Sequence, residues 1–149
     1  MCQSFSAKSR KGFTLVELAD VIVIIGVLAA FGVPRFLVSV ERSKAAEAFA
    51  YLSAVRDSQE RYQAQNGTYA STLSDLDITQ PAPTYFSVPS AGCTSTDTTW
   101  SLTLTRQGST AGYGNYTVTF TQLGFDASST ITAIPQINPM GSSGGTGGT

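Results

Sequence analysis

The feature that most constrains this chain is an apolar run close to its start. From Leu18 to Val33 only Asp20 is charged, and Leu, Val, Ile, Ala and Phe supply most of the other residues. A helix rises about 1.5 Å per residue, so the 21 residues from Phe13 to Val33 are enough to cross the hydrocarbon core of a bilayer. The run therefore predicts a membrane helix over residues 13–36.

A basic segment precedes this run, with Lys8, Arg10 and Lys11 and no acidic residue before Glu17. Such positive charge holds the N-terminal side of a membrane helix in the cytoplasm. The order of charges is similar to that of a secretory signal, but no small-x-small cleavage site follows the apolar run. Cleavage is instead expected before the run, after Gly12. It would remove residues 1–12 as a leader and leave the helix on the mature chain.

Glu17 stands at the start of the expected membrane helix, where a carboxylate is costly. The cost is about 2.5–3.5 kcal/mol at the centre of a bilayer on insertion scales, and less near the interface. Glu17 should therefore favour a cation. The nearest candidate by chemistry is the α-amino group released at Phe13, either four residues away in the same helix or on a neighbouring chain. The alternative is that Glu17 is solvated at the level of the lipid headgroups.

The segment GFTLVE, residues 12–17, resembles the class III signal of type IV pilins and type II secretion pseudopilins. The resemblance implies that a prepilin peptidase cuts after Gly12 and methylates the new N-terminal Phe13. It also implies that Glu17 pairs with the N-terminus of an adjacent subunit during assembly. Gly26 and Pro34 match a glycine and a proline that bound a segment able to unwind in the filament. Because Pro34 lacks an amide hydrogen, a kink or local melting is expected around it.

Asp20 departs from the family, whose members are usually apolar at this position. It follows Glu17 by three residues, so the two carboxylates share one helix face. Either Asp20 is a charge near the membrane interface, or it forms a second pair between subunits, with Arg35 or a free amine as the partner.

Beyond Pro34 the pattern becomes amphipathic and predicts a helix over residues 37–66. Its apolar stripe should pack on a sheet, and Asn66-Gly67 should end it with a left-handed cap. The expected stripe is Ala45, Ala48, Leu52, Val55, Gln59 and Tyr62, and the expected polar face is Glu41, Lys44, Glu47, Asp57 and Arg61, with Arg56–Glu60 and Asp57–Arg61 as i,i+4 pairs.

Residues 67–137 are expected to form a globular head. Two alternating runs, Trp100–Thr105 and Tyr116–Thr121, predict an antiparallel hairpin with one apolar face and one threonine face. Tyr85–Val88 and Ile131–Ile134 are expected to add strands, and Leu73, Leu76 and Ile78 to form a packed connecting loop. The Gly-, Ser- and Thr-rich tail, residues 138–149, is expected to be flexible.

The expected fold class is therefore α+β. A long N-terminal α-helix, half membrane-spanning and half amphipathic, should pack on a small antiparallel β-sheet head.

Composition argues against several function classes. The chain has no His, which excludes imidazole-based metal sites and His-based triads. The aspartates of the head do not show the regular ligand spacing of a calcium loop. No enzyme, cofactor or metal site is therefore expected. Removal of the leader takes away three positive charges and moves the net charge from −1 to −4, which disfavours direct nucleic-acid binding.

Cys2 lies in the leader, so Cys93 is the one cysteine of the mature chain. Many relatives close a C-terminal loop with a disulfide, and this chain cannot do so within one subunit. Cys93 is either a buried thiol or an intermolecular link.

The resemblance implies a structural subunit, a pilin, of a type IV pilus (fimbrium). Mature chains would wait in the inner membrane and then join a homo-oligomeric extracellular filament for adhesion, twitching motility or DNA uptake. The implied partners are a prepilin peptidase and an inner-membrane assembly platform. One alternative is a minor pilin or a type II secretion pseudopilin. Another is an electron-conducting filament, which would need stacked aromatics. Aromatic residues do lie along the helix, but such residues are more often core.

Overall fold

The computed structural model describes residues 12–108 and 112–141. Of the expected leader, only Gly12 lies among the described residues, and the expected flexible tail lies outside them beyond residue 141. The chain divides into two units, Met1–Phe36 and Leu37–Thr149. One long helix, α1, Leu15–Asn66, contributes residues to both units.

In the first unit, α1 begins at Leu15, two residues after the expected start at Phe13. By length and composition α1 is able to cross a membrane, and none of its most apolar window is buried. The large apolar side chains that this unit exposes include Leu15, Val16, Leu18, Val21, Ile22, Val23, Ile24, Ile25, Val27, Leu28, Phe31, Val33 and Phe36.

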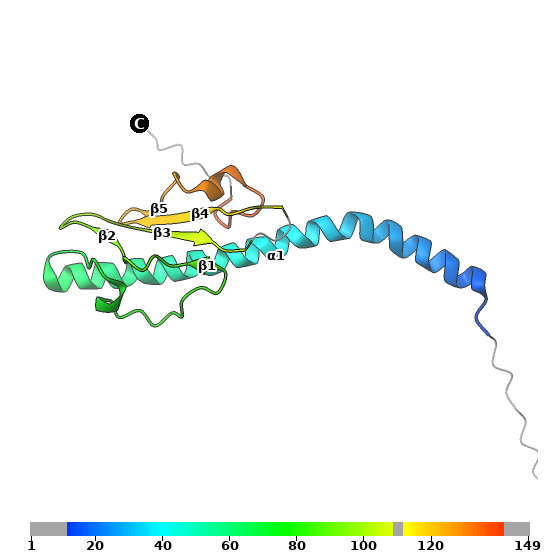
Figure 1. Ribbon diagram of the computed structural model, residues 1–149, viewed down its shortest axis with the longest axis horizontal. Coiled ribbons are helices and arrows are strands. Elements are labelled where there is room, and N and C mark those ends of the chain that lie inside the picture. Colours follow the sequence, from blue (N-terminus) through cyan, green and yellow to red (C-terminus); the bar gives the residue numbers. More distant parts are fainter. Residues whose placement is uncertain (1–11, 109–111, 142–149) are drawn as a thin grey trace, which may run out of the picture. The chain divides into compact units, whose positions relative to one another are not determined.

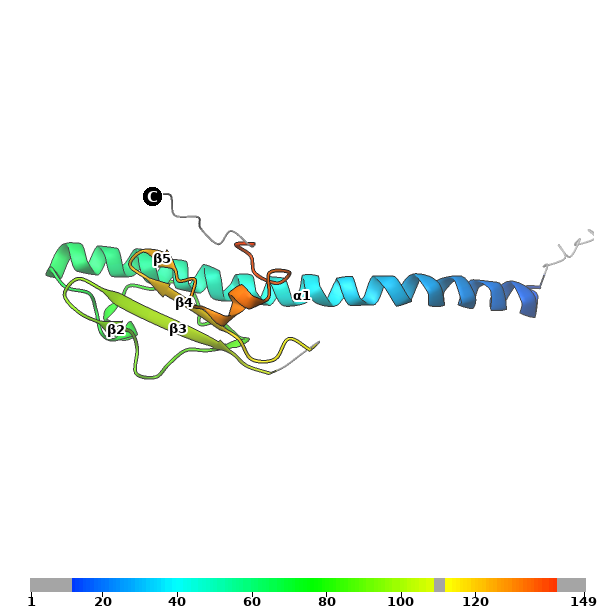
Figure 2. The same ribbon diagram turned by 90° about the horizontal axis from the view of Figure 1, so that it is seen from above.

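The second unit is a two-layer head in which an antiparallel sheet covers the C-terminal part of α1 (Figure 1). Figure 2 shows β3 and β4 lying along this part of the helix. The sheet has the order β1-β3-β4-β5, and β2 also pairs with β3. Its strands are β1, Phe86–Ser87; β2, Thr94–Ser95; β3, Trp100–Arg106; β4, Thr117–Thr121; and β5, Gly124–Phe125.

The predicted hairpin is confirmed. Strands β3 and β4 pair antiparallel, with Leu102 opposite Phe120 and Leu104 opposite Val118. The inward positions of both strands are buried, while Thr103 and Thr119 on the other face join through their hydroxyls at 2.8 Å. The alternation fixes this register, because a shift of one residue would turn the apolar set toward water.

The predicted helix stripe is also confirmed at most of its positions. Ala45, Ala48, Leu52 and Val55 are fully buried against the sheet, whereas Tyr62 is only half-buried. Burying a side chain such as Leu52 contributes about 1.5–3 kcal/mol. Phe49 adds an aromatic contact, with its ring 5.7 Å from that of Phe120 in an edge-to-face arrangement.

The helix ends as predicted, at Asn66. Gly67 has a φ of +80°, and its N–H donates to the carbonyl of Gln63 at 2.8 Å. Just beyond the cap, the chain is tied back to the helix. Gln59, which is buried, donates to the carbonyl of Ala70 and accepts from its N–H, both at 2.9 Å. This paired bond satisfies the buried amide of Gln59 and sets where the connection to the sheet begins.

The connecting loop also follows the prediction, since Leu73, Leu76 and Ile78 pack against the core. A short 3-10 helix, η1, Leu73–Asp75, lies within it. The strand expected at Tyr85–Val88 is present only as the two residues of β1.

The strand expected at Ile131–Ile134 is wrong. This segment belongs to a 3-10 helix, η2, Thr130–Ala133. The N–H of Thr117 donates to the hydroxyl of Thr130 at 2.7 Å, and the N–H of Thr119 donates to that of Ser129 at 2.9 Å. Side-chain oxygens therefore satisfy amides of β4 that a further strand would otherwise bond. Ile131 still reaches the core from η2.

Candidate assembly site

The N-terminus of α1 is closed by a reciprocal capping box between Thr14 and Glu17. The N–H and the hydroxyl of Thr14 both donate to Oε2 of Glu17, at 2.9 and 2.8 Å. The N–H of Glu17 donates in return to Oγ1 of Thr14, at 3.2 Å. A threonine three residues before a glutamate is the sequence pattern for this cap. Glu17 is therefore oriented by its own chain.

This cap changes the expected relation between Phe13 and Glu17. Phe13 precedes the helix, so the two residues are not stacked one turn apart within α1. Among the described contacts, both bonds that Glu17 accepts go to Oε2, and Oε1 accepts none. Glu17 is exposed, and its pairing with a cation from a neighbouring chain stays a prediction. Gly12 and Phe13 are exposed, and the peptide bond between them lies outside the helix.

The other residues of interest in this unit lie inside α1. Gly26 and Pro34 are both helical in the described subunit, so unwinding on assembly stays a prediction. A methyl group added at Gly26 would meet no neighbour within 4 Å. Asp20 is exposed, and its pairing between subunits also stays a prediction.

Comparison with known families identifies the N-terminal segment. Residues 7–33 match the model of the prokaryotic N-terminal methylation motif. This match covers the basic segment, the GFTLVE signal and the apolar run together.

The chain is also similar to known pilins beyond this segment. It is 39% identical over 92 residues to the type IV wide pilus major component PilA4 of Thermus thermophilus, an alignment that covers 59% of this chain and 70% of that protein. The chain belongs to the type IV pilin family. It is also 36% identical over 72 residues to the type IV major pilin PilA of Myxococcus xanthus, covering 48% of this chain and 32% of PilA.

This pilin is similar to a secretion protein as well. It is 36% identical over 75 residues to the type II secretion system core protein G of Escherichia coli, covering 50% of this chain and 52% of that protein. The chain thus spans about half of that relative. The type IV pilin family is structural and not enzymatic, and it implies a homo-oligomeric filament.

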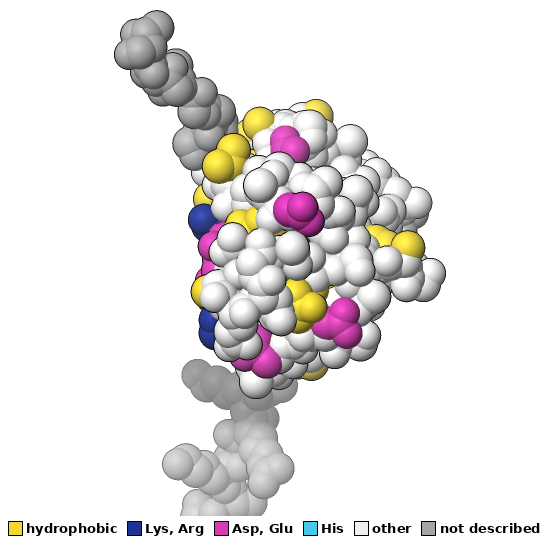
Figure 3. All heavy atoms as spheres, turned by 90° about the vertical axis from the view of Figure 1, so that its left-hand side faces the viewer, with side chains coloured by type: hydrophobic (Ala, Val, Ile, Leu, Met, Phe, Trp, Pro, Cys, Tyr) yellow, Lys and Arg dark blue, Asp and Glu magenta, His cyan; other side chains and the backbone are white. Residues whose placement is uncertain are grey.

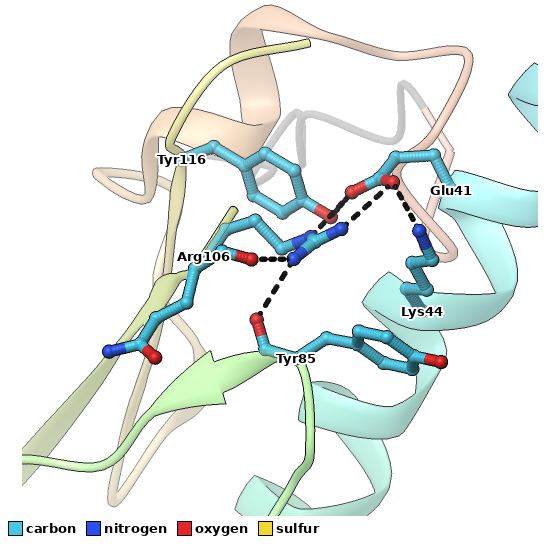
Figure 4. A network of polar contacts seen from close by, with 6 residues as sticks. Glu41, Lys44, Tyr85, Arg106 and Tyr116 are labelled. Atoms are coloured by element: carbon cyan, nitrogen blue, oxygen red, sulfur yellow. Dashed lines mark hydrogen bonds and ion pairs between the residues drawn. The ribbon is translucent and has the colours of Figure 1, made fainter. Parts of the chain in front are cut away.

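The head of this pilin holds a buried ion pair that joins α1 to the sheet (Figure 4). Glu41 of α1 and Arg106 at the end of β3 are each 2% exposed. Oε1 of Glu41 accepts from Nε of Arg106 at 2.6 Å and from the hydroxyl of Tyr116 at 3.0 Å. Oε2 accepts from Nη2 of Arg106 at 3.2 Å and lies 3.5 Å from Nζ of Lys44.

The rest of the guanidinium of Arg106 is occupied by backbone oxygens. Nη1 donates to the carbonyl of Tyr85 at 3.1 Å and also to that of Gln107. Removing a partner from such a buried pair leaves an uncompensated charge. The network therefore fixes where the sheet lies along the helix.

The charges of the network reinforce one another. Burial alone would raise the pKa of Glu41, but hydrogen bonds from Arg106 and Tyr116 and the charges of Arg106 and Lys44 lower it overall. Burial, followed by the neighbouring Glu41 carboxylate, raises the pKa of the Tyr116 phenol. Glu41 is therefore ionised and Tyr116 neutral at neutral pH.

Sequence reasoning placed Glu41 on the exposed polar face, and this was wrong. Its partner Arg106 is 65 residues away, and no local pattern signals such a pairing. One signal was available in the strand, because Arg106 occupies the next inward position after Trp100, Leu102 and Leu104. A charge at an inward position predicts a buried partner. Lys44 and Glu47 are half-buried, and only Asp57 and Arg61 of the expected polar face are exposed.

The ion-pair partner of Arg61 is Asp77, whereas the predicted i,i+4 partner, Asp57, acts on Arg61 only through its charge. Nε and Nη2 of Arg61 donate to the two carboxylate oxygens of Asp77 at 3.0 and 2.7 Å. Arg56–Glu60 is likewise absent from the ion pairs of the described residues.

Cys93 is a buried thiol whose pKa is raised by that burial, so the structure favours the first of its two alternatives. Within residues 12–108 and 112–141, no three His, Cys, Asp or Glu side chains gather as a metal site. The end of the head in Figure 3 carries several acidic side chains and few basic ones.

Proposed function

We propose that this chain is a structural subunit of a type IV pilus, a pilin that polymerises into an extracellular filament. The observation that carries the proposal is the first part of α1, whose large apolar side chains are exposed in the subunit and whose first turn holds Glu17. A surface of this size needs either lipid or other copies of the same helix around it. A pilin uses both in turn.

Processing would begin at the exposed segment before the helix. A prepilin peptidase would cut after Gly12 and methylate the amino group of Phe13. Because α1 starts at Leu15, the bond to be cut lies outside helical structure and is open to the peptidase. The mature subunit would keep its whole apolar stretch, residues 13–36, and wait in the inner membrane.

Assembly would move that stretch from lipid into a bundle of identical helices. Lipid tails and the bundle interior are similarly apolar, so the hydrophobic contribution to the free energy of assembly roughly cancels. Specific contacts between helices then decide whether assembly is favourable. Glu17 is suited to provide one such contact. The capping box uses Oε2, and Oε1 would accept from a cation of a neighbouring copy. We expect that cation to be the methylated amine of Phe13 on a neighbouring copy. An inner-membrane assembly platform would supply the work of extraction.

A pseudopilin of a type II secretion system is the second candidate, because core protein G is similar over half its length. Both candidates share the signal and the helix. They differ in whether the filament is abundant at the cell surface, where it would serve adhesion, motility or DNA uptake. The acidic end of the head favours partners other than nucleic acid for the subunit itself.

The test is intact mass spectrometry of filaments sheared from cells. A dominant species with the mass of residues 13–149 plus one methyl group would support the major pilin. The same species as a trace among another dominant pilin would indicate a minor pilin. Its confinement to the inner membrane would favour the pseudopilin, and an uncut N-terminus would contradict all three.

A matched pair of variants tests the role of the Glu17 charge. Glu17→Gln removes the charge but keeps a residue that forms the same capping box. We expect it to be processed and inserted normally and to yield no filaments. Glu60→Gln removes an exposed carboxylate from the C-terminal part of the same helix and serves as the control. Normal filament yield from Glu17→Gln would exclude the proposed pair with Phe13.

A further inference from the structure

A groove lies on the surface of the head where α1 passes the segment leading into β1. It has a volume of about 370 Å³ and is lined by Val40, Ser43, Lys44 and Glu47 of α1 and by Tyr85. The four helix residues have the spacing i, i+3, i+4 and i+7. That spacing outlines the kind of hole that receives a side chain from a neighbouring helix in knobs-into-holes packing.

The ring of Tyr85 forms one wall of this groove and is held firmly although it is 44% exposed. Nζ of Lys44 lies 5.0 Å from the ring centroid, and the guanidinium of Arg106 lies 5.4 Å from it (Figure 4). Arg106 also binds the carbonyl of Tyr85, and Glu47 accepts the N–H of Thr84 at 2.8 Å. An exposed aromatic ring fixed in this way loses little freedom on binding, which is typical of an interface anchor.

We propose that this groove docks a second copy of the chain in the filament, by receiving the side chain of Phe36 from that copy. The inference rests on the proposed function and names the contact between neighbouring subunits on the head side of the apolar stretch. The buried Glu41–Arg106 network then acts as a positioning device for Tyr85.

Continuity along α1 argues for a second copy as the occupant. The groove begins at Val40, four residues beyond Phe36, which is the last exposed aromatic residue of the apolar surface that the family buries in its filament. Proximity along the helix argues for Phe36 among the exposed phenylalanines of that surface. Placing the Phe36 of another copy at the centre of the groove requires that copy to lie about 11 Å farther along the helix direction.

Phe31 provides a matched alternative. It is 75% exposed and Phe36 is 66% exposed, so the two differ little in availability. Phe31 would need a shift of about 19 Å to reach the same groove. A phenyl ring also suits the site chemically, because it can pack edge-to-face or offset on the ring of Tyr85.

The first experiment is disulfide trapping in assembled filaments. Cells that carry the wild-type chain also express two variants together, Ser43→Cys and Phe36→Cys. Cys93, the native thiol of the mature chain, is buried and is present in every sample. After oxidation of sheared filaments, we expect a disulfide-linked dimer. We expect none when Phe31→Cys replaces Phe36→Cys, and none from Ser43→Cys alone. Filaments that contain Ser43→Cys and Phe36→Cys but yield no linked dimer would overturn the proposal. A dimer that forms only with Phe31→Cys would overturn it as well.

The second experiment measures the contribution of the ring. Tyr85→Ala should lower the yield of sheared filaments at least about tenfold, as expected for an interface anchor. Tyr85→Phe keeps the ring and should stay near the wild-type yield. The melting temperature of each full-length variant in detergent shows whether the head is intact. An intact Tyr85→Ala subunit that assembles at the wild-type level would contradict the inference.

The two proposals fail in different ways. If the wild-type chain forms no methylated filament, the proposed function fails. If wild-type filaments form and both the trapping and the Tyr85→Ala results are negative, only the docking site fails.

Discussion

The two parts of α1 have the same secondary structure and opposite surroundings. Before Leu37 its large apolar side chains are exposed, with Ile22 as an example at 70%. After Leu37 its apolar stripe is fully buried beneath the sheet, as at Leu52 and Val55. The two parts therefore differ in their burial partner and not in their backbone.

This difference shows why one helix can serve two purposes. The part after Leu37 gains its partner from its own chain, because the sheet supplies an apolar face. The part before it must find a partner elsewhere, in lipid or in other copies. Glu41 lies at the start of the docked part, and its bond to Arg106 secures that end of the head.

The largest expected effect on the stability of the head comes from the Glu41–Arg106 pair. Glu41→Ala should lower the free energy of unfolding of the head by about 3–5 kcal/mol, because it leaves the Arg106 guanidinium buried without its counter-charge. Denaturant unfolding of the full chain in detergent, followed through Trp100, measures the loss. Glu60→Ala, at an exposed position of the same helix, should change the value by less than about 0.5 kcal/mol. Equal values for the two variants would mean that the network does not secure the head.

The comparison between the two parts is sharpened by one substitution made in each. Leu52→Ala should cost the head about 2–5 kcal/mol, because it opens a cavity in the core. Leu28→Ala should leave the head within about 0.5 kcal/mol of wild type. It should instead reduce filament yield, since Leu28 is 66% exposed in the subunit and belongs to the surface proposed to pack in the filament. A large loss of head stability from Leu28→Ala would show that the two parts are coupled within one subunit.

Acid should weaken the docked part. The folded pKa of Glu41 lies below its ordinary value of 4.5, so unfolding becomes coupled to proton uptake. The contribution of Glu41 is fully present above about pH 4.5 and is lost as the pH falls through the lowered folded value. Unfolding free energies from about pH 7 down to about pH 3 should therefore fall more steeply for the wild-type chain than for Glu41→Gln. If the unfolding free energies of the wild-type chain and of Glu41→Gln fell in parallel with pH, Glu41 would not be the group that couples acid to stability.

The smallest expected effect is at an exposed ion pair near the end of the docked part. Arg61 and Asp77 have side chains that are 51% and 67% exposed. Water and salt screen such a pair, so Arg61→Ala should lower the stability of the head much less than Glu41→Ala or Leu52→Ala. The cost should shrink further at high salt. A loss as large as that of Glu41→Ala would mean that position along the helix matters more than burial.

Local patterns predicted the parts of this fold that depend on local physics. The helix ends at Asn66-Gly67 because glycine accepts the left-handed backbone there. The hairpin forms in the expected register because alternate residues of β3 and β4 must share one buried face. The threonine and glutamate of the capping box were also visible in the sequence. Thr14 was interpreted only as part of the processing signal, and Glu17 as part of that signal and as the residue that pairs with an N-terminus during assembly.

Long-range contacts decided the rest. The apolar pattern at Ile131–Ile134 suits either a strand or a buried turn, and the hydroxyls of Ser129 and Thr130 settled the choice by bonding β4. In the sequence, Glu41 has the spacing of a surface residue. In the folded chain, the hairpin brings Arg106 against it and the pair is buried. Tyr85 has no distinguishing local context, and only its contacts with Lys44 and Arg106 make it a fixed wall of the groove.

The sequence by itself determined that a signal at residues 12–17 precedes a long apolar helix with an amphipathic continuation. These properties depend on residues within a few turns of one another. The tertiary structure alone decided which charges are buried and which aromatic ring is held at the surface. Such outcomes depend on side chains tens of residues apart, whose pairing becomes favourable only when folding removes water from around them.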